Sequence, residues 1–374
     1  MSPLAHTPAR RTWAEIDLSA LRHNLDTIRR CVGAKVGVIA VVKADAYGHG
    51  IQAVVPLLAP HVEMLAVANV NEAIATQALA PDRPVLLLSP ALPDERPEIV
   101  ARGFIPLVSS VEEAAAYSAL ARIAPAPVHL KLDTGMGRAG VWHENALAAW
   151  REISALHGVK ITGIASHLPV ADEDEVFTNV QLAVFHRRVA ELRERGFPDV
   201  PRHVANSAGA IAFSEQAGDL VRVGLALYGS SPCKFFQPQL RPVLTWKTRV
   251  ALVRDVPAGS GVSYGRTFIT PRPMRLATLA VGYADGYSRH LSNAGTEVLL
   301  QGHRCAVVGR VTMDQIVVDV SDLQSIEEGA EVVLLGRQGS EEILAAELAA
   351  KAGTIPWDVF TRIGSRVARV AGDV

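Results

Sequence analysis

A lysine at the end of an apolar run is the residue with the clearest chemical potential in this sequence. Residues 36–42 form a continuous run rich in Val and Ile, which predicts a strand buried on both faces, and Lys43 follows directly. The carboxyl ends of barrel strands are where barrel enzymes keep their active sites. A partly desolvated lysine there can attack a carbonyl and form a Schiff base. Position alone also allows a lysine that simply leaves the strand.

Polar side chains follow other apolar runs in the same way. They are Asp133 to Arg138 after residues 128–132, Ser166 and His167 after 159–164, Asn206 and Ser207 after 202–205, Arg222 and Gly224 at 220–223, and Tyr228 shortly beyond. Each alone can be a surface charge, a core histidine or a helix cap, but their shared placement at strand ends favours one common site.

The last two of these runs suggest a ligand. Loops after the seventh and eighth strands of barrels commonly bind phosphate through backbone N–H groups and a hydroxyl, and Ser207 and Gly224 suit that task. A reactive lysine facing a phosphate site suggests pyridoxal phosphate, although this spacing selects no reaction.

The elements that must position these residues alternate between strand and helix. Expected strands are 36–42, 64–68, 85–88, 105–108, 128–132, 159–164, 202–205 and 220–223, and expected helices include Asn71–Ala80, Ser110–Ile123, Asn145–His157 and Asn179–Arg195. Such alternation predicts a parallel (β/α)8 barrel of the TIM type over residues 1–238. An open doubly wound sheet is the competing fold, but no Gly-x-Gly-x-x-Gly follows the first strand.

The pattern changes after Pro238, where β-rich segments separated by Gly- and Pro-containing turns predict a mostly antiparallel domain over residues 239–374. These segments are Val243–Val256, Met274–Val281, Thr296–Leu300, Cys305–Val308 and Gln315–Val320. One clear helix is expected near Glu341–Ala352. Thr12–Asp17 reads as a short strand, and residues 1–12 are a segment that could pack on the β domain.

Composition excludes several classes of protein. A net charge of −1 argues against nucleic acid or an acidic membrane surface as partner. The three cysteines lie far apart without CxxC spacing, which indicates a reducing compartment and no disulfide framework or structural zinc. No apolar run approaches the length of a membrane span, and the first ten residues lack the apolar core of a signal peptide. A cytoplasmic enzyme without a metal site is the expectation.

Several long motifs together resemble the alanine racemases. They are Ala40–Gly50, which is similar to the pyridoxal-phosphate attachment site of that family, Lys131–Arg138, His203–Ser207, Arg222–Gly229, Ser263–Arg266, Gly282–Gly286 and Gly309–Asp314. The motifs stand in the family's order over nearly the whole chain. The resemblance implies a pyridoxal-phosphate enzyme that interconverts L- and D-alanine, either supplying D-alanine for peptidoglycan or feeding D-alanine catabolism.

The resemblance also implies two bases. Lys43 would hold the cofactor and take the α-proton from D-alanine, and Tyr264 would be the base for L-alanine. Tyr264 would come from the second domain of the partner subunit, which makes the active enzyme a head-to-tail homodimer. Racemisation removes a proton from one face of a planar intermediate and returns one to the other face, so two bases on opposite faces suffice.

Further roles follow from the same resemblance. Arg222 would face the pyridine nitrogen, Arg138 the phenolic oxygen of the cofactor and the substrate carboxylate, and His167 would link Tyr264 to Arg222. The remaining residues are Tyr47, Asn206, Ser207, Gly224 and Tyr228 at the cofactor, Met313, Asp314 and Tyr283 at the substrate, and Asp172, Arg289 and Arg310 at the entrance.

Lys131 and the substrate range extend the hypothesis. Family members often carry a carbamylated lysine at the position of Lys131, and a carbamate would turn a cation near Arg138 into an anion that orients the guanidinium. The sequence departs from the family pattern around Leu168, Pro169 and Ser365. Serine and other small amino acids are therefore candidate substrates beside alanine.

Two other functions stay open at this point. A pyridoxal-phosphate amino-acid decarboxylase on the same barrel would need a cysteine-bearing loop at the substrate face, whereas Cys305 lies in a β-like run. A non-catalytic pyridoxal-phosphate carrier would resemble the first domain only, and the second domain here contains Tyr264.

Overall fold

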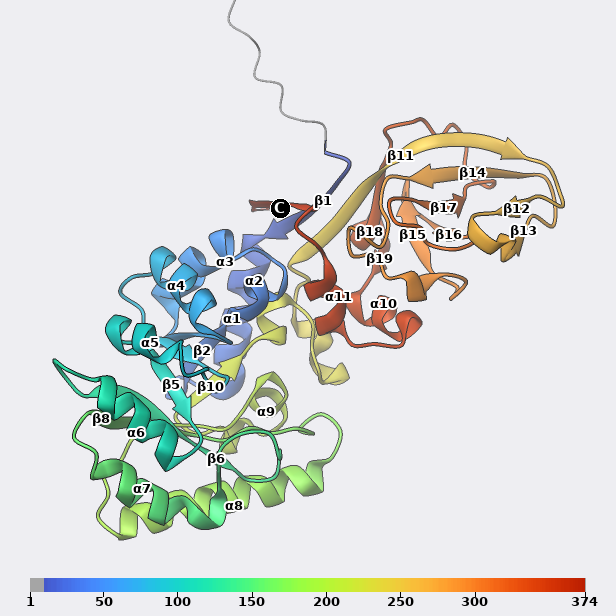
Figure 1. The fold of residues 1–374 in the computed structure, drawn as a ribbon. Coiled ribbons are helices and arrows are strands. Elements are labelled where there is room, and N and C mark those ends of the chain that lie inside the picture. The colour runs from blue at the N-terminus through green and yellow to red at the C-terminus, as the bar shows by residue number, and fades with distance from the viewer. Residues whose placement is uncertain (1–9, 374) are drawn as a thin grey trace, which may run out of the picture. The chain divides into compact units, whose positions relative to one another are not determined.

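The computed structural model describes residues 10–373 and divides into two compact units (Figure 1). We call Ala20–Arg241 the barrel unit. The described residues up to Ser19, together with those from Pro242 onward, form the β unit.

The barrel unit contains a parallel sheet in the order β10-β2-β3-β4-β5-β6-β8-β9, with β7 beside β6. Its strands are β2 (Gly37–Val41), β3 (Met64–Val67), β4 (Val85–Leu87), β5 (Ile105–Val108), β6 (Ala126–Asp133), β7 (Val141–Trp142), β8 (Val159–Ala165), β9 (Arg202–His203) and β10 (Leu220–Val223). Backbone hydrogen bonds from Asp219 N to Arg202 O (2.9 Å) and from Arg222 N to Ala205 O (3.0 Å) join the two end strands. This ring confirms the predicted (β/α)8 barrel and excludes the open doubly wound sheet.

Helices follow the strands and lie around them (Figure 1). They are α1 (Leu18–Val32), α2 (Lys43–Tyr47), α3 (Ile51–Leu58), α4 (Val70–Leu79), α5 (Arg96–Arg102), α6 (Val111–Leu120), α7 (Ala146–Ser154), α8 (Glu175–Glu194) and α9 (Ser207–Ala212), with short 3-10 turns η1 (Ala59–His61), η2 (His143–Asn145), η3 (Ser214–Gln216), η4 (Leu225–Tyr228) and η5 (Lys234–Gln239). In α1 the apolar positions Leu21, Leu25 and Ile28 recur at helical spacing and are buried.

The β unit is built on a mostly antiparallel sheet in the order β16-β15-β18-β11-β1-β20. Strand β14 pairs with β11 and β17, β19 pairs with β18, and β12 with β13 forms a separate hairpin. The elements are β1 (Thr12–Asp17), β11 (Leu244–Val256), β12 (Gly261–Val262), η6 (Tyr264–Arg266), β13 (Phe268–Ile269), β14 (Met274–Leu279), η7 (Arg289–Leu291), β15 (Glu297–Leu300), β16 (His303–Ala306), β17 (Ile316–Asp319), β18 (Glu331–Gln338), β19 (Glu341–Ile343), α10 (Ala345–Ala352), α11 (Pro356–Arg362) and β20 (Ala368–Gly372). The predicted antiparallel second domain is confirmed.

Two details of the β unit differ from expectation. Strand β1 pairs antiparallel with β11 and parallel with β20, so Thr12–Asp17 belongs to this unit and not to the barrel. Residues 1–9 of the segment expected to pack there lie outside the described residues. The helix predicted near Glu341–Ala352 is present as α10 (Ala345–Ala352), but Glu341–Ile343 is strand β19, and a second helix that was not predicted, α11, begins at Pro356. Proline is favoured in the first helical turn, where its missing N–H has no partner to lose.

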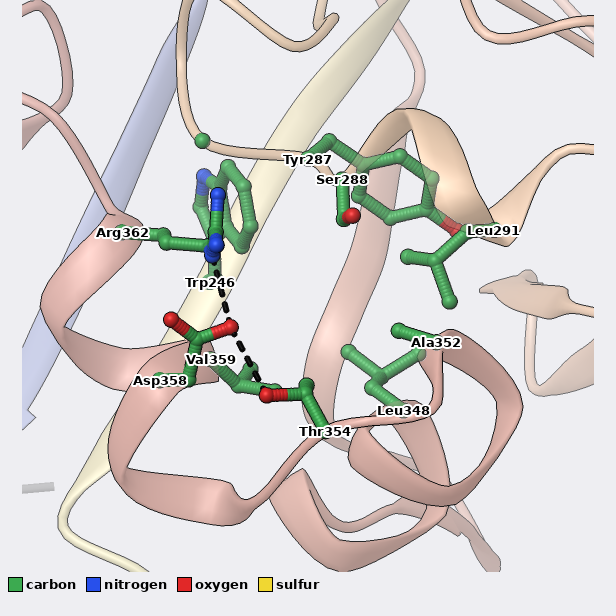
Figure 2. Close-up of a pocket in the computed structure, with 11 residues that line it drawn as sticks. Trp246, Tyr287, Ser288, Leu291, Leu348, Ala352, Thr354, Asp358, Val359 and Arg362 are labelled. Atoms are coloured by element: carbon green, nitrogen blue, oxygen red, sulfur yellow. Dashed lines mark hydrogen bonds and ion pairs between the residues drawn. The ribbon is translucent and has the colours of Figure 1, made fainter.

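A small cavity lies inside the β unit between η7 and helices α10 and α11 (Figure 2). Trp246, Tyr287 and Leu348 contribute to its lining, and an ion pair between Arg362 and Asp358 (2.6 Å) lies at its edge. It encloses about 20 Å³, enough for a single water molecule. This cavity is too small for an amino acid or a cofactor. Among the helices of residues 10–373, none combines the length and apolar character needed to span a membrane.

Candidate active site

Lys43 stands at the start of an unusual turn. It follows β2 and Val42, and the four residues Ala44–Tyr47 have φ between 52° and 55°. Left-handed backbone is unfavourable for residues with a Cβ by roughly 1–2 kcal/mol each, so four in succession store several kcal/mol. A backbone hydrogen bond from Gly48 N to Ala44 O (2.8 Å) closes the turn. Strain of this kind concentrates at functional sites.

Tyr47, Ser207 and Gly224 meet at a second point, beyond the carboxyl ends of β2, β9 and β10. We call this end of the barrel the barrel mouth. The Ser207 hydroxyl accepts the N–H of Gly224 (3.1 Å) and that of Ala226 (3.4 Å). A Cβ added to Gly224 would lie 2.4 Å from Tyr47 Oη, so only glycine lets the Tyr47 hydroxyl lie this close to the backbone. Two hydroxyls gathered beside the backbone N–H groups of a glycine-containing loop fit a phosphate group.

Tyr228 and Asn206 position the group formed by Tyr47, Ser207 and Gly224, which we call the phosphate cradle. The rings of Tyr47 and Tyr228 stack at 4.9 Å, and the Tyr228 hydroxyl donates to Val41 O (2.9 Å). Burial raises the pKa of Tyr47 to about 12, so its hydroxyl stays protonated and can donate to an anion. The Asn206 side chain caps α9 by accepting the N–H of Gly209 (3.0 Å) and donates to Leu168 O (3.0 Å).

Arg222 is buried and organises the centre of the mouth. Its guanidinium donates to the carbonyls of His203 (2.6 Å), Ser166 (2.7 Å) and Val204 (3.1 Å). It also lies 2.8 Å from His203 Nδ1 and 3.0 Å from His167 Nδ1. A guanidinium only donates, so both imidazoles accept at Nδ1 and carry their hydrogen on Nε2. The Nε2–H of His167 is then left to donate to a further group.

A chain of buried imidazoles continues behind Arg222. His203 Nε2 lies 2.8 Å from His129 Nδ1, and the tautomer assigned above makes His203 the donor. Burial, followed by the charge of Arg222, lowers the pKa of His129 to about 4 and that of His203 well below its ordinary value. Both rings are therefore neutral near pH 7. The positive charge of Arg222 is therefore stabilised by hydrogen bonds to uncharged carbonyl and imidazole groups.

Positive groups gather at this mouth. Burial, followed by the charge of Arg138, lowers the pKa of Lys43, and Glu72 opposes this shift. Burial, then Arg138 and Arg222, lowers the pKa of Lys131 to about 8. Burial lowers the pKa of Arg222 to about 10, and burial with these four cations lowers that of His167 well below its ordinary value. Such a site favours an anionic ligand and a lysine that is partly neutral, which is the nucleophilic form.

Asp133 orders the loop that carries Arg138. Its carboxylate oxygen Oδ1 accepts the N–H groups of Gly135 (2.9 Å), Met136 (2.9 Å) and Gly137 (3.2 Å). These donors outweigh the effect of burial and lower the pKa of Asp133. Arg138 itself is exposed at the mouth, where its side chain can reach a ligand.

The predicted residues of the β unit form a second group on neighbouring loops. The Ser263 hydroxyl, next to Tyr264, donates to Arg310 O (2.7 Å), and Tyr283 N donates to Thr312 O (3.0 Å) beside Met313. Arg289 lies in η7. The residue after η7, Ser292, accepts the N–H of Val311 at its Oγ (3.0 Å). Tyr264 is 73% exposed, Met313 53% and Tyr283 42%. Exposed aromatic and thioether groups on clustered loops are typical of a surface that meets another chain.

Some residues of the site escaped the sequence analysis. Glu72 contacts the turn after Lys43, His129 continues the imidazole chain, and Arg366 pairs with Asp314 (2.8 Å) and Asp285 (3.2 Å). Asn69-x-x-Glu72 is a capping-box pattern that could have drawn attention to Glu72. His129 and Arg366 have no comparable local signal. Asp172 is exposed in the loop that follows β8, as expected for an entrance residue of the barrel unit.

Comparison with known proteins identifies the family. The family models described as "Alanine racemase, N-terminal domain" and "Alanine racemase, C-terminal domain" match residues 16–232 and 243–371. The chain belongs to the alanine racemase family. Alanine racemases are isomerases that use pyridoxal phosphate, and the cradle at Tyr47, Ser207 and Gly224 fits the phosphate of that cofactor.

Individual alanine racemases match over their full length. The enzyme of Halothermothrix orenii is 40% identical over 96% of both chains, and that of Symbiobacterium thermophilum is 41% identical over 97% of both. The structure of the Streptomyces coelicolor enzyme has a TM-score of 0.88 at 38% identity, covering 96% of this chain and 98% of its own. The Bartonella henselae structure, which contains covalently bound pyridoxal phosphate, has a TM-score of 0.88 at 32% identity over 97% and 100% of the two chains.

Proposed function

We propose that this chain interconverts L- and D-alanine by a two-base mechanism, with Lys43 as one base and the partner subunit's Tyr264 as the other. The observation that carries the proposal is the half-buried Lys43 amine, whose pKa is lowered by burial and by Arg138 and whose following turn carries Tyr47 of the phosphate cradle. A related enzyme from Bacillus anthracis, 33% identical with a TM-score of 0.88, has been solved with L-Ala-P bound. Alanine is therefore the proposed substrate, and serine and other small amino acids are secondary candidates.

Each residue of the mouth has a distinct task in this proposal. Pyridoxal phosphate, when bound, withdraws electrons from the α-carbon and so makes its proton acidic. Tyr47, Ser207 and Gly224 hold the phosphate, while Asn206 and Tyr228 position them. Arg138 binds the substrate carboxylate and the cofactor's phenolic oxygen. Lys43 holds the cofactor and exchanges the proton on one face of the α-carbon.

The second base depends on the chain from Arg222 through His167. A phenol acts as a base more readily when a hydrogen-bond donor stabilises its anion. His167 accepts from Arg222 at Nδ1, so its Nε2–H is available to donate to the partner subunit's Tyr264. Arg222 itself would face the pyridine nitrogen and disfavour its protonation. We expect Arg222→Glu to increase side products such as those of transamination, and unchanged partitioning would contradict this role.

The dimer supplies the rest of the site. We propose that the exposed loops of the β unit meet the barrel mouth of the partner, with Met313, Asp314 and Tyr283 at the substrate. Asp172, Arg289 and Arg310 would form the polar entrance. The high exposure of Tyr264 and Met313 supports this arrangement, because large exposed side chains on clustered loops favour an interface.

Lys131 is a candidate for carbamylation. Its lowered pKa, about 8, leaves more of the neutral amine that reacts with carbon dioxide, and the resulting anion would lie near Arg138 and Arg222. An intact-mass measurement should show one added carbamate, retained at alkaline pH with bicarbonate. An unmodified Lys131 in fully active enzyme would remove this part of the proposal.

The other readings of the sequence are weaker. A pyridoxal-phosphate carrier would match the first unit alone, whereas the second family model covers residues 243–371. A decarboxylase would need a cysteine on a substrate loop, and Cys305 is buried in strand β16. D-alanine supply for peptidoglycan and D-alanine catabolism are the two physiological roles we consider, with a cytoplasmic location.

Mixing two inactive variants tests the two-base proposal and the dimer together. We expect Lys43→Ala and Tyr264→Phe each to abolish loss of optical rotation of L-alanine. After refolding or co-expression, a heterodimer would contain one site with both Lys43 and Tyr264 intact. Since half of the dimers are mixed and each has one such site, activity should recover to about a quarter of wild type. No recovery would place both bases in one chain. Carbon dioxide release from wild type would instead indicate the decarboxylase, and no turnover the carrier.

A further inference from the structure

Glu72 connects the first turn of α4 to the strained turn after Lys43. Its Oε1 accepts the N–H of Ala44 (2.8 Å) and its Oε2 accepts the N–H of Ala68 (2.8 Å). The backbone N–H of Glu72 itself donates to the side chain of Asn69 (3.0 Å), the N-cap of α4. One carboxylate thus ties the end of β3, the start of α4 and the residue following Lys43, and α2 lies beside α4 in the barrel unit (Figure 1).

The contact falls where the backbone changes hand. Val42 has φ −115°, and Ala44 is the first of the four left-handed residues. The N–H of Ala44 points away from the turn's own hydrogen bonds, and the carboxylate gives it a charge-assisted partner. A conformation that is unfavourable by itself persists only where its surroundings determine it, and Glu72 is the side chain that holds its first residue.

We propose that Glu72 is a positioning residue, which holds the left-handed turn and thereby aims the Lys43 amine at the cofactor. This inference rests on the proposed function, in which Lys43 binds pyridoxal phosphate. Glu72 touches neither the phosphate cradle nor the Arg222 network in its hydrogen bonds, so its effect passes through the turn. Its negative charge also opposes burial and Arg138, which lower the pKa of Lys43.

The chain contains a matched control. Glu113 stands in α6 as Glu72 stands in α4: its N–H donates to the N-cap Ser110 (3.1 Å), and its Oε2 accepts the N–H of Ser109 (2.8 Å). Its other oxygen, Oε1, has no hydrogen-bond partner among the described side-chain and backbone groups. Glu113 therefore shares the capping role of Glu72 without the contact to the lysine-bearing turn.

Covalent attachment of pyridoxal phosphate to the apo form of the full chain tests the inference. Attachment is followed by the absorbance band of the bound cofactor and by intact mass after borohydride reduction. We expect Glu72→Gln to slow attachment and weaken it about tenfold, the loss expected for one charge-assisted hydrogen bond. Glu113→Gln should lower the melting temperature as much as Glu72→Gln does, because both residues hold the N-terminus of a helix. It should leave attachment within about twofold of wild type, because Glu113 does not contact the turn after Lys43.

Two more variants separate geometry from charge and from folding. Glu72→Asp keeps the charge but is too short to bridge both N–H groups, so it should resemble Glu72→Gln. Glycine adopts positive φ without strain, so Ala44→Gly added to Glu72→Gln should restore part of the attachment rate. Normal attachment in Glu72→Gln, equal losses in Glu72→Gln and Glu113→Gln, or normal attachment in Glu72→Asp would each overturn the inference. If wild type itself attached no pyridoxal phosphate at Lys43, the proposed function would fail instead.

Discussion

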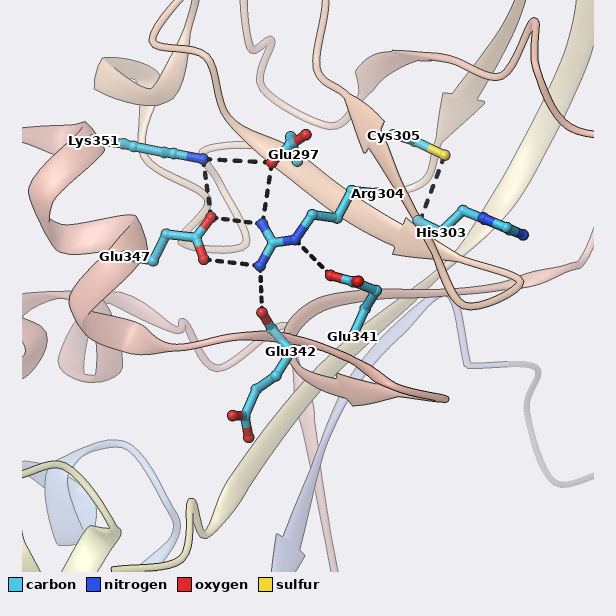
Figure 3. A network of polar contacts seen from close by, with 8 residues as sticks. All are labelled: Glu297, His303, Arg304, Cys305, Glu341, Glu342, Glu347 and Lys351. Atoms are coloured by element: carbon cyan, nitrogen blue, oxygen red, sulfur yellow. Dashed lines mark hydrogen bonds and ion pairs between the residues drawn. The ribbon is translucent and has the colours of Figure 1, made fainter. Parts of the chain in front are cut away.

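Two clusters of charged residues in this protein shift the pKa of an arginine in opposite directions. In the β unit Arg304 donates to the carboxylates of Glu341 (2.8 Å), Glu297 (3.1 Å) and Glu347 (2.9 Å), and Lys351 joins Glu347 at 2.9 Å (Figure 3). Bonds to Glu347 and Glu341 raise the pKa of Arg304. At the barrel mouth Arg222 donates to three carbonyls and two imidazoles, and burial lowers its pKa to about 10.

The difference indicates what each cluster is for. In the Arg304 network both cations are paired with carboxylates of the β unit and are partly exposed, so the network adds modestly to stability. The barrel mouth gathers Lys43, Lys131, Arg138 and Arg222. Burial lowers the pKa of Lys43, Lys131 and Arg222, and repulsion from neighbouring cations lowers the pKa of Lys43 and Lys131 further. Glu72 and Asp133 only partly offset these cations, so the arrangement is suited to a phosphate and a substrate carboxylate.

The largest effect is expected for Lys43→Met. The variant removes the proposed base and attachment point, so racemisation should fall by at least about a thousandfold, within the range for loss of a general base and nucleophile. Because one cation leaves a cluster of cations, the free energy of unfolding should not decrease. Optical rotation of L-alanine and urea denaturation measure the two quantities. A clear loss of stability would mean that the mouth is not a strained cationic site.

Arg222→Met should have the largest effect on stability. It leaves three carbonyls and two imidazoles without their donor inside the barrel, and removal of a buried, fully bonded charge lowers stability by about 3–5 kcal/mol. Urea denaturation of the variant, followed by circular dichroism, gives the value. A loss below about 1 kcal/mol, the range of exposed pairs, would erase the contrast with Arg304.

Arg304→Met should be milder and depend on salt. Its side chain is 28% exposed and its partners are 28–41% exposed, so we expect a loss of about 1 kcal/mol. The loss should shrink further in about 1 M salt, where screening acts within about 3 Å. Matched denaturation series with and without added salt test this. Racemase activity should be unchanged, and an equal loss at both salt concentrations would speak against an ionic origin.

The smallest effect concerns acid. Burial tends to raise the pKa of Glu347, but Arg304 and Lys351 outweigh it and lower the pKa below 4.5. A carboxyl group with a depressed folded-state pKa contributes stability above its unfolded value, and this contribution is lost as pH falls through the folded value. Wild type should therefore exceed Glu347→Gln by a few tenths of a kcal/mol at about pH 6 and lose that margin near about pH 3. A margin that grows in acid would contradict the assignment.

Local pattern made much of the site predictable. The apolar run before Lys43 placed it at the end of a buried strand, and the polar residues after later runs, Arg138, His167, Ser207 and Arg222, do gather at the same mouth. The left-handed turn was not predictable. The local signs of positive φ are the glycines at 48 and 50, and both lie after the turn residues Ala44, Asp45 and Ala46. The capping pattern at Glu72 was visible but gave no hint of its contact with Ala44.

By itself, the sequence determined the order of strands and helices, the change to a β-rich second half and the family, since these follow from periodicity and motifs read along the chain. Only the tertiary structure decided which strands pair and which side chains form hydrogen bonds with one another. Strand β1 joins partners more than two hundred residues away, at Leu244–Val256 and Ala368–Gly372. The proton positions on His167, His203 and His129 follow only from the approach of Arg222. Contacts of that kind depend on barrel closure and pairing over long range, which no local run of residues encodes.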